Sequence, residues 1–505
     1  MFDIKEMSFM FEKALPEQVG VSSAHIKEYI QYLENNGLAT HSIVMVRHGK
    51  VFYEKYYAPF HADFYHRLYS DSKSYVSLAI GFLVQEGKVE LDAPITKYFD
   101  PSITANAGEM VKKQTVEDML MMSTGFPSKY GNWFGEHPEN RLKWYFDTSS
   151  REGACKVPGS LFEYDSNGSF VLCALVETIT GMTFDEFMND RLYSKIGVSS
   201  DTYTLKCPGG NSWGDSGVMA RAIDQAKVIQ FVMNDGKWCG EQILDADYVR
   251  TARSNLIDTN LELVTSPERF GYGYQIWTTR DNGFFFNGMG CELAVAVPGK
   301  DMVFVINSDN QGLDYGKRVI INGFFDIIAN KVNSDTLPDN KAEFEALAEY
   351  SDSLELYSLK GSAESRITDK INGKEYMMKP NDMGITKIKF TFSGDTGVLE
   401  YTNAQGEKKL GFGIDKNVFG KFPQEGYSDM VGNTFAPGNY YDCAASAKII
   451  DDDRISILVQ VIDKYFGRLN MCFAFNDSGD VTAKMSKTAE DFFGEYVGLA
   501  IGRVV

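Results

Sequence analysis

The apolar pattern of this 505-residue chain changes near residue 332, and that change constrains its fold more than any other feature. Before it, segments of helical period such as 70–86 alternate with short strand-like pairs. After it, alternating apolar and polar residues recur in short segments between 374 and 476, which is typical of an antiparallel β domain. The predicted order is an α+β domain at 1–331, a polar, proline-containing linker at 332–341, and a barrel- or lipocalin-like β domain at 342–505.

The composition excludes several classes of partner. The 50 basic and 69 acidic residues give a net charge of −19, which repels nucleic acids and anionic membranes. Seven cysteines without a C-x-x-C pair predict free thiols rather than a disulfide framework. The N-terminus lacks the pattern of a signal peptide, and the longest apolar stretch, Val76–Val84, is too short to span a bilayer. We therefore expect a cytoplasmic protein with a small-molecule substrate; the sequence carries no indication of its oligomeric state.

The histidines exclude the commonest serine and zinc chemistries. All six lie at or before residue 137, so none follows the single G-x-S-x-G match at Gly210–Gly214. An α/β-hydrolase needs a histidine after its nucleophile, and we therefore expect Ser212 to lie in an ordinary glycine-rich loop. Zinc-site and nucleotide-binding motifs are also missing from the sequence, so we expect neither a metal nor a cofactor.

A serine can also be activated by a lysine of lowered pKa. The single S-x-x-K motif of the chain is Ser70–Lys73, at the start of the predicted helix. Spacing of three places both side chains on one helical face, and the helix N-terminus favours a developing negative charge. The apolar helix that follows would desolvate the lysine and lower its pKa. An N-capping serine followed by a surface lysine is an equally good interpretation of this segment alone.

Five stretches in a fixed order resemble one family of proteins. They are HRLYSDSKSYVSLAIGFLVQEGKVELDAPITKYF (66–99), TVEDMLMMSTGF (115–126), PGSLFEYDSNGSFVLCALVETITGMTFDEFM (158–188), FGYGYQIW (270–277) and FNGMGCELAVAVP (286–298). Together they resemble the serine β-lactamase and penicillin-binding-protein superfamily over about residues 14–330, in particular its class C-like branch. That branch includes family VIII carboxylesterases and 6-aminohexanoate-dimer hydrolases. The resemblance implies a central antiparallel sheet flanked by helices, with a mainly helical insert.

The resemblance also implies roles for three side chains. Ser70 would be the nucleophile that becomes acylated. Lys73 would take its proton or hold Tyr164 as a phenolate. Tyr164 fills the first position of the Y-x-N motif, and it would act as the general base and then pass the proton to the leaving group. Without the resemblance, Tyr164 would be interpreted as a half-buried aromatic residue at a loop–helix junction.

The third motif implies the binding site for the substrate carbonyl. The oxyanion hole would use the backbone N–H groups of Ser70 and Met289. Gly288 and Gly290 flank Met289, and they suit a strand edge that a substrate must approach closely. A plain β-bulge is the alternative interpretation of these two glycines.

The chain departs from the family at two motif positions. Ser166 stands where the Y-x-N motif has its asparagine, with Asn167 next to it. Phe286 stands where lactamases and peptidases carry a lysine or histidine that binds a substrate carboxylate. We assign all three positions to substrate binding and expect that the missing cation weakens the case for β-lactam or D-alanyl substrates.

These observations predict a serine hydrolase that forms an acyl-enzyme on Ser70 and acts on a small ester or amide. Two alternatives remain open at this stage. The chain could be a true β-lactamase or D-amino-acid peptidase, or a non-catalytic ligand-binding protein that kept the pocket.

Overall fold

The computed structural model describes residues 11–127, 139–259, 265–361, 366–428, 430–431, 435–489 and 492–505. The chain divides into two compact units, Met1–Glu355 and Leu356–Val505. The boundary therefore differs from the predicted linker at 332–341. Helix α15 (Lys341–Asp352) packs on helix α2 (Ser23–Asn35) within the first unit. A hydrogen bond of 3.0 Å between the hydroxyls of Tyr53 and Ser351 fastens α15 to the sheet of that unit.

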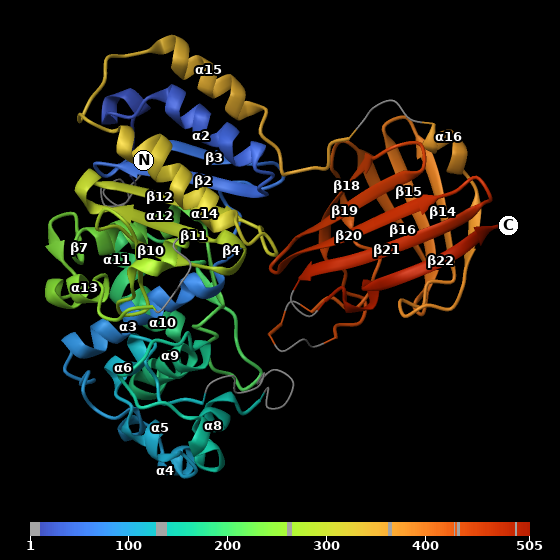
Figure 1. Cartoon of the computed structure of the whole chain (residues 1–505). Coiled ribbons are helices and arrows are strands. Elements are labelled where there is room, and N and C mark those ends of the chain that lie inside the picture. The colour runs from blue at the N-terminus through green and yellow to red at the C-terminus, as the bar shows by residue number, and fades with distance from the viewer. Residues whose placement is uncertain are drawn as a thin grey trace. The chain divides into compact units, whose positions relative to one another are not determined.

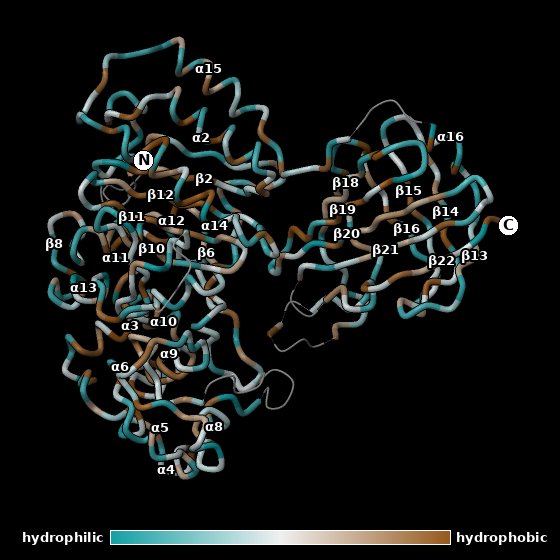
Figure 2. The backbone as a smooth tube through the Cα atoms, viewed as in Figure 1, coloured by the Kyte–Doolittle hydropathy of each residue, from teal (hydrophilic) through white to brown (hydrophobic). Residues whose placement is uncertain are grey.

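The first unit is built on an antiparallel sheet. Among the described residues, seven strands lie in the order β1-β3-β2-β12-β11-β10-β9, and the short edge pair β1–β3 is the one parallel pairing. Their bounds are β1 Glu12–Lys13, β2 Thr40–Arg47, β3 Lys50–Tyr56, β9 Trp277–Thr278, β10 Phe284–Asn287, β11 Leu293–Val297 and β12 Met302–Ser308. Every residue of β2, β11 and β12 is buried, because helices cover both faces of the sheet. Figure 2 shows this as almost continuous hydrophobic colour along β11 and β12.

Helices from distant parts of the sequence cover the sheet (Figure 1). On one face, Tyr29 of α2 packs edge-on against Phe304 and donates a 2.9 Å hydrogen bond to the Ile320 carbonyl of α14 (Gly316–Gly323). Helix α12 (Ala222–Met233) packs against β2, β11 and β12.

A mainly helical part completes the first unit. Its helices are α3 Ser72–Gln85, α4 Pro101–Thr104, α5 Glu109–Lys113, α6 Val116–Leu120, α8 Arg141–Phe146, α9 Ser166–Thr180, α10 Phe184–Met188, α11 Ser194–Ile196 and α13 Ala246–Ala252. Helix α3 packs against α9 and α13, and α9 in turn contacts α6, α8 and α10. Within the described ranges, no helix combines the length and the apolar character needed to cross a bilayer.

The second unit is a closed β-barrel. Nine of its described strands form the wall, in the order β16-β15-β14-β13-β22-β21-β20-β19-β18, and a parallel pairing of β16 with β18 closes it. The strands are β13 Glu375–Met378, β14 Lys387–Ser393, β15 Thr396–Asn403, β16 Gly406–Ile414, β18 Asp442–Ile449, β19 Arg454–Ile462, β20 Phe466–Phe475, β21 Asp480–Ala489 and β22 Gly498–Val504. Strand β17 (Val418–Lys421) pairs with β18 alone. Residues alternate between buried and exposed along β21, which is the pattern that predicted an antiparallel β domain. The predicted α+β class of the chain is thus confirmed, with an α+β first unit and a barrel-like β domain as the second.

Candidate active site

Ser70 lies in a strained turn that leads into α3. A single 3-10 turn, Tyr69–Asp71, precedes this helix, so the predicted helical start at residue 70 is correct to within two residues. Tyr69 adopts a left-handed backbone conformation with φ of 49° and is almost fully buried. The guanidinium of Arg67 lies 4.1 Å from its ring centroid, between this ring and that of Trp213. This packing holds the strained residue in place directly before the candidate nucleophile.

Lys73 is buried and points at Ser70. Its Nζ donates hydrogen bonds to Ser70 Oγ at 2.9 Å and to the Asp215 main-chain oxygen at 2.6 Å. The side chain is 1% exposed, and burial lowers the pKa of the amine to about 8. The carboxylate of Asp215 opposes this shift, whereas the positive charge of Arg141 adds to it. A sizeable neutral fraction of Lys73 is therefore available to accept a proton at mildly alkaline pH.

Tyr164 lies beside the same pair. Its ring centroid is 5.1 Å from Lys73 Nζ, and the ring stacks on Trp277 at 6.0 Å with an interplanar angle of 19°. Although 39% of the residue is exposed, burial of the phenol raises its pKa above the usual 10, and a hydrogen bond with the Ser70 side chain opposes that rise. The structure thus brings together the three residues to which the sequence assigned catalytic roles.

Two residues that the sequence analysis missed support Lys73. Arg141 of α8 donates to both carboxylate oxygens of Asp215, at 2.7 and 3.0 Å. Both side chains are nearly inaccessible, with 2% and 4% of their surfaces exposed. They lie 74 residues apart and outside any recognisable motif, so the sequence held no signal that paired them.

Ser166 and Asn167 form the first turn of α9, after the N-capping residue Asp165. Asn167 Oδ1 accepts a hydrogen bond from Arg141 Nη2 at 3.1 Å. Among the described residues, neither Ser166 nor Asn167 hydrogen-bonds to Lys73. The side-chain amide of Asn167, next to the expected motif position, therefore contacts Arg141. The structure does not bring Ser166 or Asn167 into contact with Lys73.

The turn Gly288–Gly290 follows β10 and lies against the chain that enters Ser70. A Cβ atom on Gly288 would lie 2.3 Å from the Leu68 carbonyl oxygen, so this position requires glycine. Gly290 has φ of 78°, which glycine adopts without strain. Met289 between them is 42% exposed and lines a cavity of about 700 Å³. Close backbone approach explains Gly288, the positive φ explains Gly290, and the exposed turn leaves Met289 accessible.

Phe286 occupies a different environment from the one its motif position suggested. Its side chain is 1% exposed and packs edge-on against Tyr75 of α3, with ring centroids 6.3 Å apart. The phenyl ring therefore fills the space between β10 and α3. Burial of the Phe286 side chain in the core does not fit the expected contact with a substrate.

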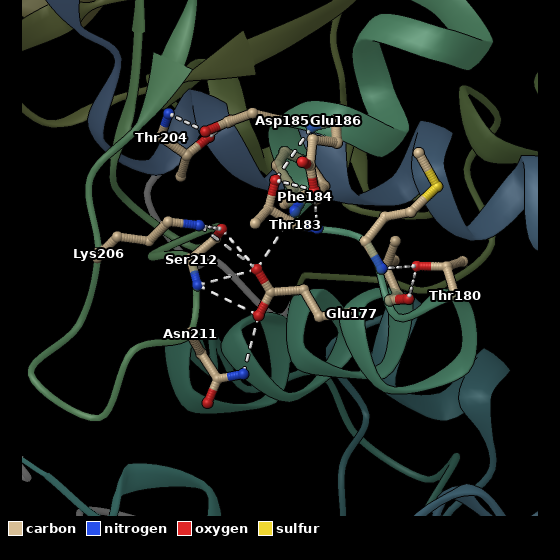
Figure 3. Close-up of polar contacts among 12 residues, drawn as sticks. Glu177, Thr180, Thr183, Phe184, Asp185, Glu186, Thr204, Lys206, Asn211 and Ser212 are labelled. Carbon is tan, nitrogen blue, oxygen red and sulfur yellow. Dashed lines mark hydrogen bonds and ion pairs between the residues drawn. The ribbon is translucent and has the colours of Figure 1, made fainter.

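The other serine singled out in the sequence lies in a closed polar cluster (Figure 3). Ser212 is fully buried in an isolated β-bridge with Lys206, and its Oγ donates to Glu177 Oε1 at 2.6 Å. Lys206 Nζ donates to the same Oγ, also at 2.6 Å. Ser212 is thus part of a loop that is fastened to α9, in agreement with the predicted absence of a nucleophile elbow.

Comparison with known proteins points to the same family that the sequence motifs resemble. A family model described as Beta-lactamase matches residues 25–319, more than half of the chain. The curated 6-aminohexanoate-dimer hydrolase of Paenarthrobacter ureafaciens is 25% identical over 223 residues, which cover 42% of this chain and 56% of that protein. Protein flp of Staphylococcus aureus strain MW2 is 23% identical over 32% of this chain and 34% of its own length. The chain thus spans about half or less of these relatives.

Two solved structures share the fold of the first unit. A putative 6-aminohexanoate-dimer hydrolase from Bacillus anthracis matches with a TM-score of 0.51 and 22% identity, over 65% of this chain and 89% of that one. A penicillin-binding-protein homologue from Caulobacter crescentus matches with a TM-score of 0.50 and 15% identity, over 62% and 98%. At these identities the similarity establishes the fold and leaves the chemistry to the site itself.

Proposed function

The chain belongs to the Beta-lactamase family, and from this premise we propose that it is a metal-independent serine hydrolase. In this proposal Ser70 becomes acylated and the substrate is a small ester or amide. The observation that carries the proposal is the 2.9 Å contact between the Ser70 hydroxyl and a buried lysine amine whose pKa is lowered to about 8.

The pKa shifts favour Lys73 over Tyr164 as the base that activates Ser70. Burial lowers the pKa of Lys73 and raises that of Tyr164, so the neutral amine is far more accessible than the phenolate. Lys73 takes the Ser70 proton while the Oγ–carbon bond forms. The Tyr164 hydroxyl then gives its proton to the leaving group as the carbon–oxygen or carbon–nitrogen bond breaks. Proton return from Lys73 to Tyr164 completes the transfer, and water repeats the sequence to release the acid.

The negative charge that develops on the carbonyl oxygen needs hydrogen-bond donors. We assign this task to the backbone N–H groups of Ser70 and Met289. Two observations support the assignment: Gly288 lies against the chain that enters Ser70, and Met289 is accessible at the edge of a cavity.

The surroundings of the site favour an uncharged substrate. Phe286 adds no cation to the third motif. Of the two cations that line the cavity beside Met289, Lys317 is paired with Glu268, and Arg318 donates a hydrogen bond to Thr265. We therefore expect neutral esters and amides to be better substrates than β-lactams with a free carboxylate.

A panel of p-nitrophenyl esters, anilides and β-lactams tests this proposal directly. The wild type should hydrolyse the neutral ester or anilide, and Ser70→Ala should not. Hydrolysis of a chromogenic cephalosporin as fast as of the best ester would instead support a β-lactamase. Absence of turnover and of covalent labelling by a fluorophosphonate would support a non-catalytic binding protein.

We also propose a reducing compartment, such as the cytoplasm. All seven cysteines lie in described residues and are free thiols, and Cys239 and Cys472 are exposed. Exposed thiols oxidise readily in an oxidising compartment. Alkylation under denaturing conditions, as the protein is released from cells, should therefore block all seven, because four of them are buried in the fold. A disulfide in the freshly isolated protein would contradict this location.

A further inference from the structure

Lys73 has two hydrogen-bond acceptors, and the second belongs to a loop held by an ion pair. Besides Ser70 Oγ, its amine donates to the Asp215 main-chain oxygen at 2.6 Å. Arg141 donates hydrogen bonds to the carboxylate of that same residue through both of its terminal nitrogens. We propose that Arg141 and Asp215 are positioning residues that orient Lys73 toward Ser70 and balance the charge around its amine. This inference rests on the proposed function, because it acts through the proposed base.

The ion pair joins three separate segments around the lysine. Arg141 comes from α8, Asp215 from the loop between β5 (Tyr203–Thr204) and β6 (Val218–Ala220), and Asn167 from the first turn of α9. The guanidinium lies 4.2 Å from the Phe170 ring centroid, which fixes its plane. A bidentate contact of this kind fixes direction as well as distance, so the loop cannot rotate away from Lys73 without breaking it.

A second arginine holds the next residue of the same loop. Arg67 Nε donates to the Ser216 main-chain oxygen at 2.9 Å, and its Nη2 donates to Ser216 Oγ at 3.0 Å. Two buried arginines thus fasten consecutive residues, namely the residue whose main-chain oxygen accepts from Lys73 and the residue after it. Support of this kind keeps the acceptor in a fixed position.

The charged groups around Lys73 act in opposite directions. Burial has the largest effect and lowers the pKa of Lys73. The negative charges of Asp215 and Asp165 oppose this lowering, and the positive charges of Arg141 and Arg67 add to it. Asp165 is held by Thr124 Oγ1 and the Gly168 N–H, at 3.0 Å each.

Two further carboxyl groups near the site have hydrogen-bond or ion-pair partners of their own. The Asp71 carboxyl, next to Ser70, accepts from Gln225 at 3.0 Å. Glu268, whose negative charge helps to raise the pKa of Tyr164, forms an ion pair with Lys317. Since Arg141 and Asp215 form a neutral pair, removing one member leaves a single buried charge next to Lys73.

This charge balance makes a prediction that a merely structural ion pair would not. Arg141→Met leaves the Asp215 carboxylate unopposed and should raise the pKa of Lys73. Asp215→Asn keeps the main-chain acceptor but removes the negative charge, and it should lower that pKa. The double variant restores neutrality and should return the pKa toward its wild-type value.

The readout is the second-order rate constant for fluorophosphonate labelling of Ser70 as a function of pH, which needs no knowledge of the natural substrate. The midpoint of its alkaline rise should move up by about one pH unit in Arg141→Met and down by about one in Asp215→Asn. Arg47→Met is the matched control, because this buried arginine contacts the Val19, Lys300 and Ser334 carbonyls far from Ser70. It should lower the unfolding midpoint without moving the pH midpoint.

Each outcome decides one question. Opposite shifts that cancel in the double variant support the inference. Unchanged midpoints in both single variants, with slower labelling, would reduce the pair to a structural role and overturn it. If Arg141→Met does not fold, Arg141→Lys retains the charge without the bidentate contact and should slow labelling at an unchanged midpoint. A wild type that does not label at Ser70 would contradict the proposed function itself, and the inference with it.

Discussion

The described part of the first unit contains two hydrogen-bonded serine–lysine pairs that differ little in distance and greatly in surroundings. Lys73 lies 2.9 Å from Ser70 Oγ, and Lys206 lies 2.6 Å from Ser212 Oγ. The second pair is the shorter, so proximity alone would select the wrong serine. Ser212 is fully buried and its hydroxyl donates to Glu177, as Figure 3 shows. The Lys206 side chain is 42% exposed, and its ammonium lies 3.7 Å from the same carboxylate.

The difference shows what a lysine needs in order to activate a serine. At Ser70 the amine is removed from water, and its other acceptor is a neutral carbonyl, so burial lowers its pKa to about 8. At Ser212 the carboxylate of Glu177 accepts the hydrogen bond of the serine hydroxyl and also pairs with the lysine. The first arrangement favours proton transfer from serine to lysine. The second favours a fixed hydrogen-bond network that fastens the loop to α9.

The largest expected difference between the pairs concerns the serines themselves. Ser70→Ala removes the covalent acceptor and should lower kcat/KM on a neutral ester by roughly 10³-fold or more. Ser212→Ala should leave kcat/KM within about threefold of the wild type, because that hydroxyl faces Glu177 and is inaccessible. Steady-state kinetics on both variants measure the contrast. Comparable losses in the two would show that the pairs are not functionally distinct.

The lysines should differ nearly as much. Lys73→Met and Tyr164→Phe should each lower kcat/KM by about 10²–10⁴-fold, and the double variant by little more, since the two side chains act in one proton relay. Lys206→Met is the matched control and should have a small effect on rate. Losses that multiply in the double variant would show that Lys73 and Tyr164 act independently.

The lowered pKa of Lys73 predicts a pH profile. Neutral Lys73 is the active form, so kcat/KM should rise with pH and level off above about 8. Two pH units below that midpoint, activity should be about 10²-fold lower, because each unit reduces the neutral fraction about tenfold. A profile that is flat between pH 6 and 9 would argue against an amine of this pKa as the base.

The second pair should instead affect stability. Glu177 accepts hydrogen bonds from the Ser212 hydroxyl and from Asn211 Nδ2, at 2.6 and 2.8 Å. Glu177→Ala should therefore lower the free energy of unfolding by ~2 kcal/mol, measured by urea denaturation, while kcat/KM of the folded enzyme stays near that of the wild type. An activity loss that exceeds the fraction unfolded would place this cluster in the catalytic machinery.

Local sequence spacing predicted the parts of the site that are close in the chain. Ser70 and Lys73 share one helical turn, so their contact follows from the spacing. Arg141 and Asp215 are brought together by the packing of α8 on α9 and by the path of a loop, neither of which leaves a pattern in the sequence. The motif position of Phe286 came from the family resemblance, but its burial depends on Tyr75 of another element.

The same distinction applies to the fold. Alternating residues predicted strands β13, β14, β15, β19 and β20 and the end of β18. They did not predict β16, β17, β21 and β22, or the parallel β16–β18 pairing that closes the barrel. The polar segment 332–341 was predicted as the linker, yet α15 follows it and packs back on α2, which moves the boundary to Glu355–Leu356. Local composition identified an irregular segment correctly and could not reveal the tertiary contacts that come after it.

The central claim is that the buried lysine, rather than the closer one, activates its serine. Peptide mapping by mass spectrometry after brief fluorophosphonate labelling tests this claim most directly. We expect one adduct, on Ser70. It should form faster at pH 8.5 than at pH 6.5, and it should be lost in Lys73→Met but not in Lys206→Met. An adduct on Ser212, or labelling of Ser70 that does not depend on Lys73, would contradict it.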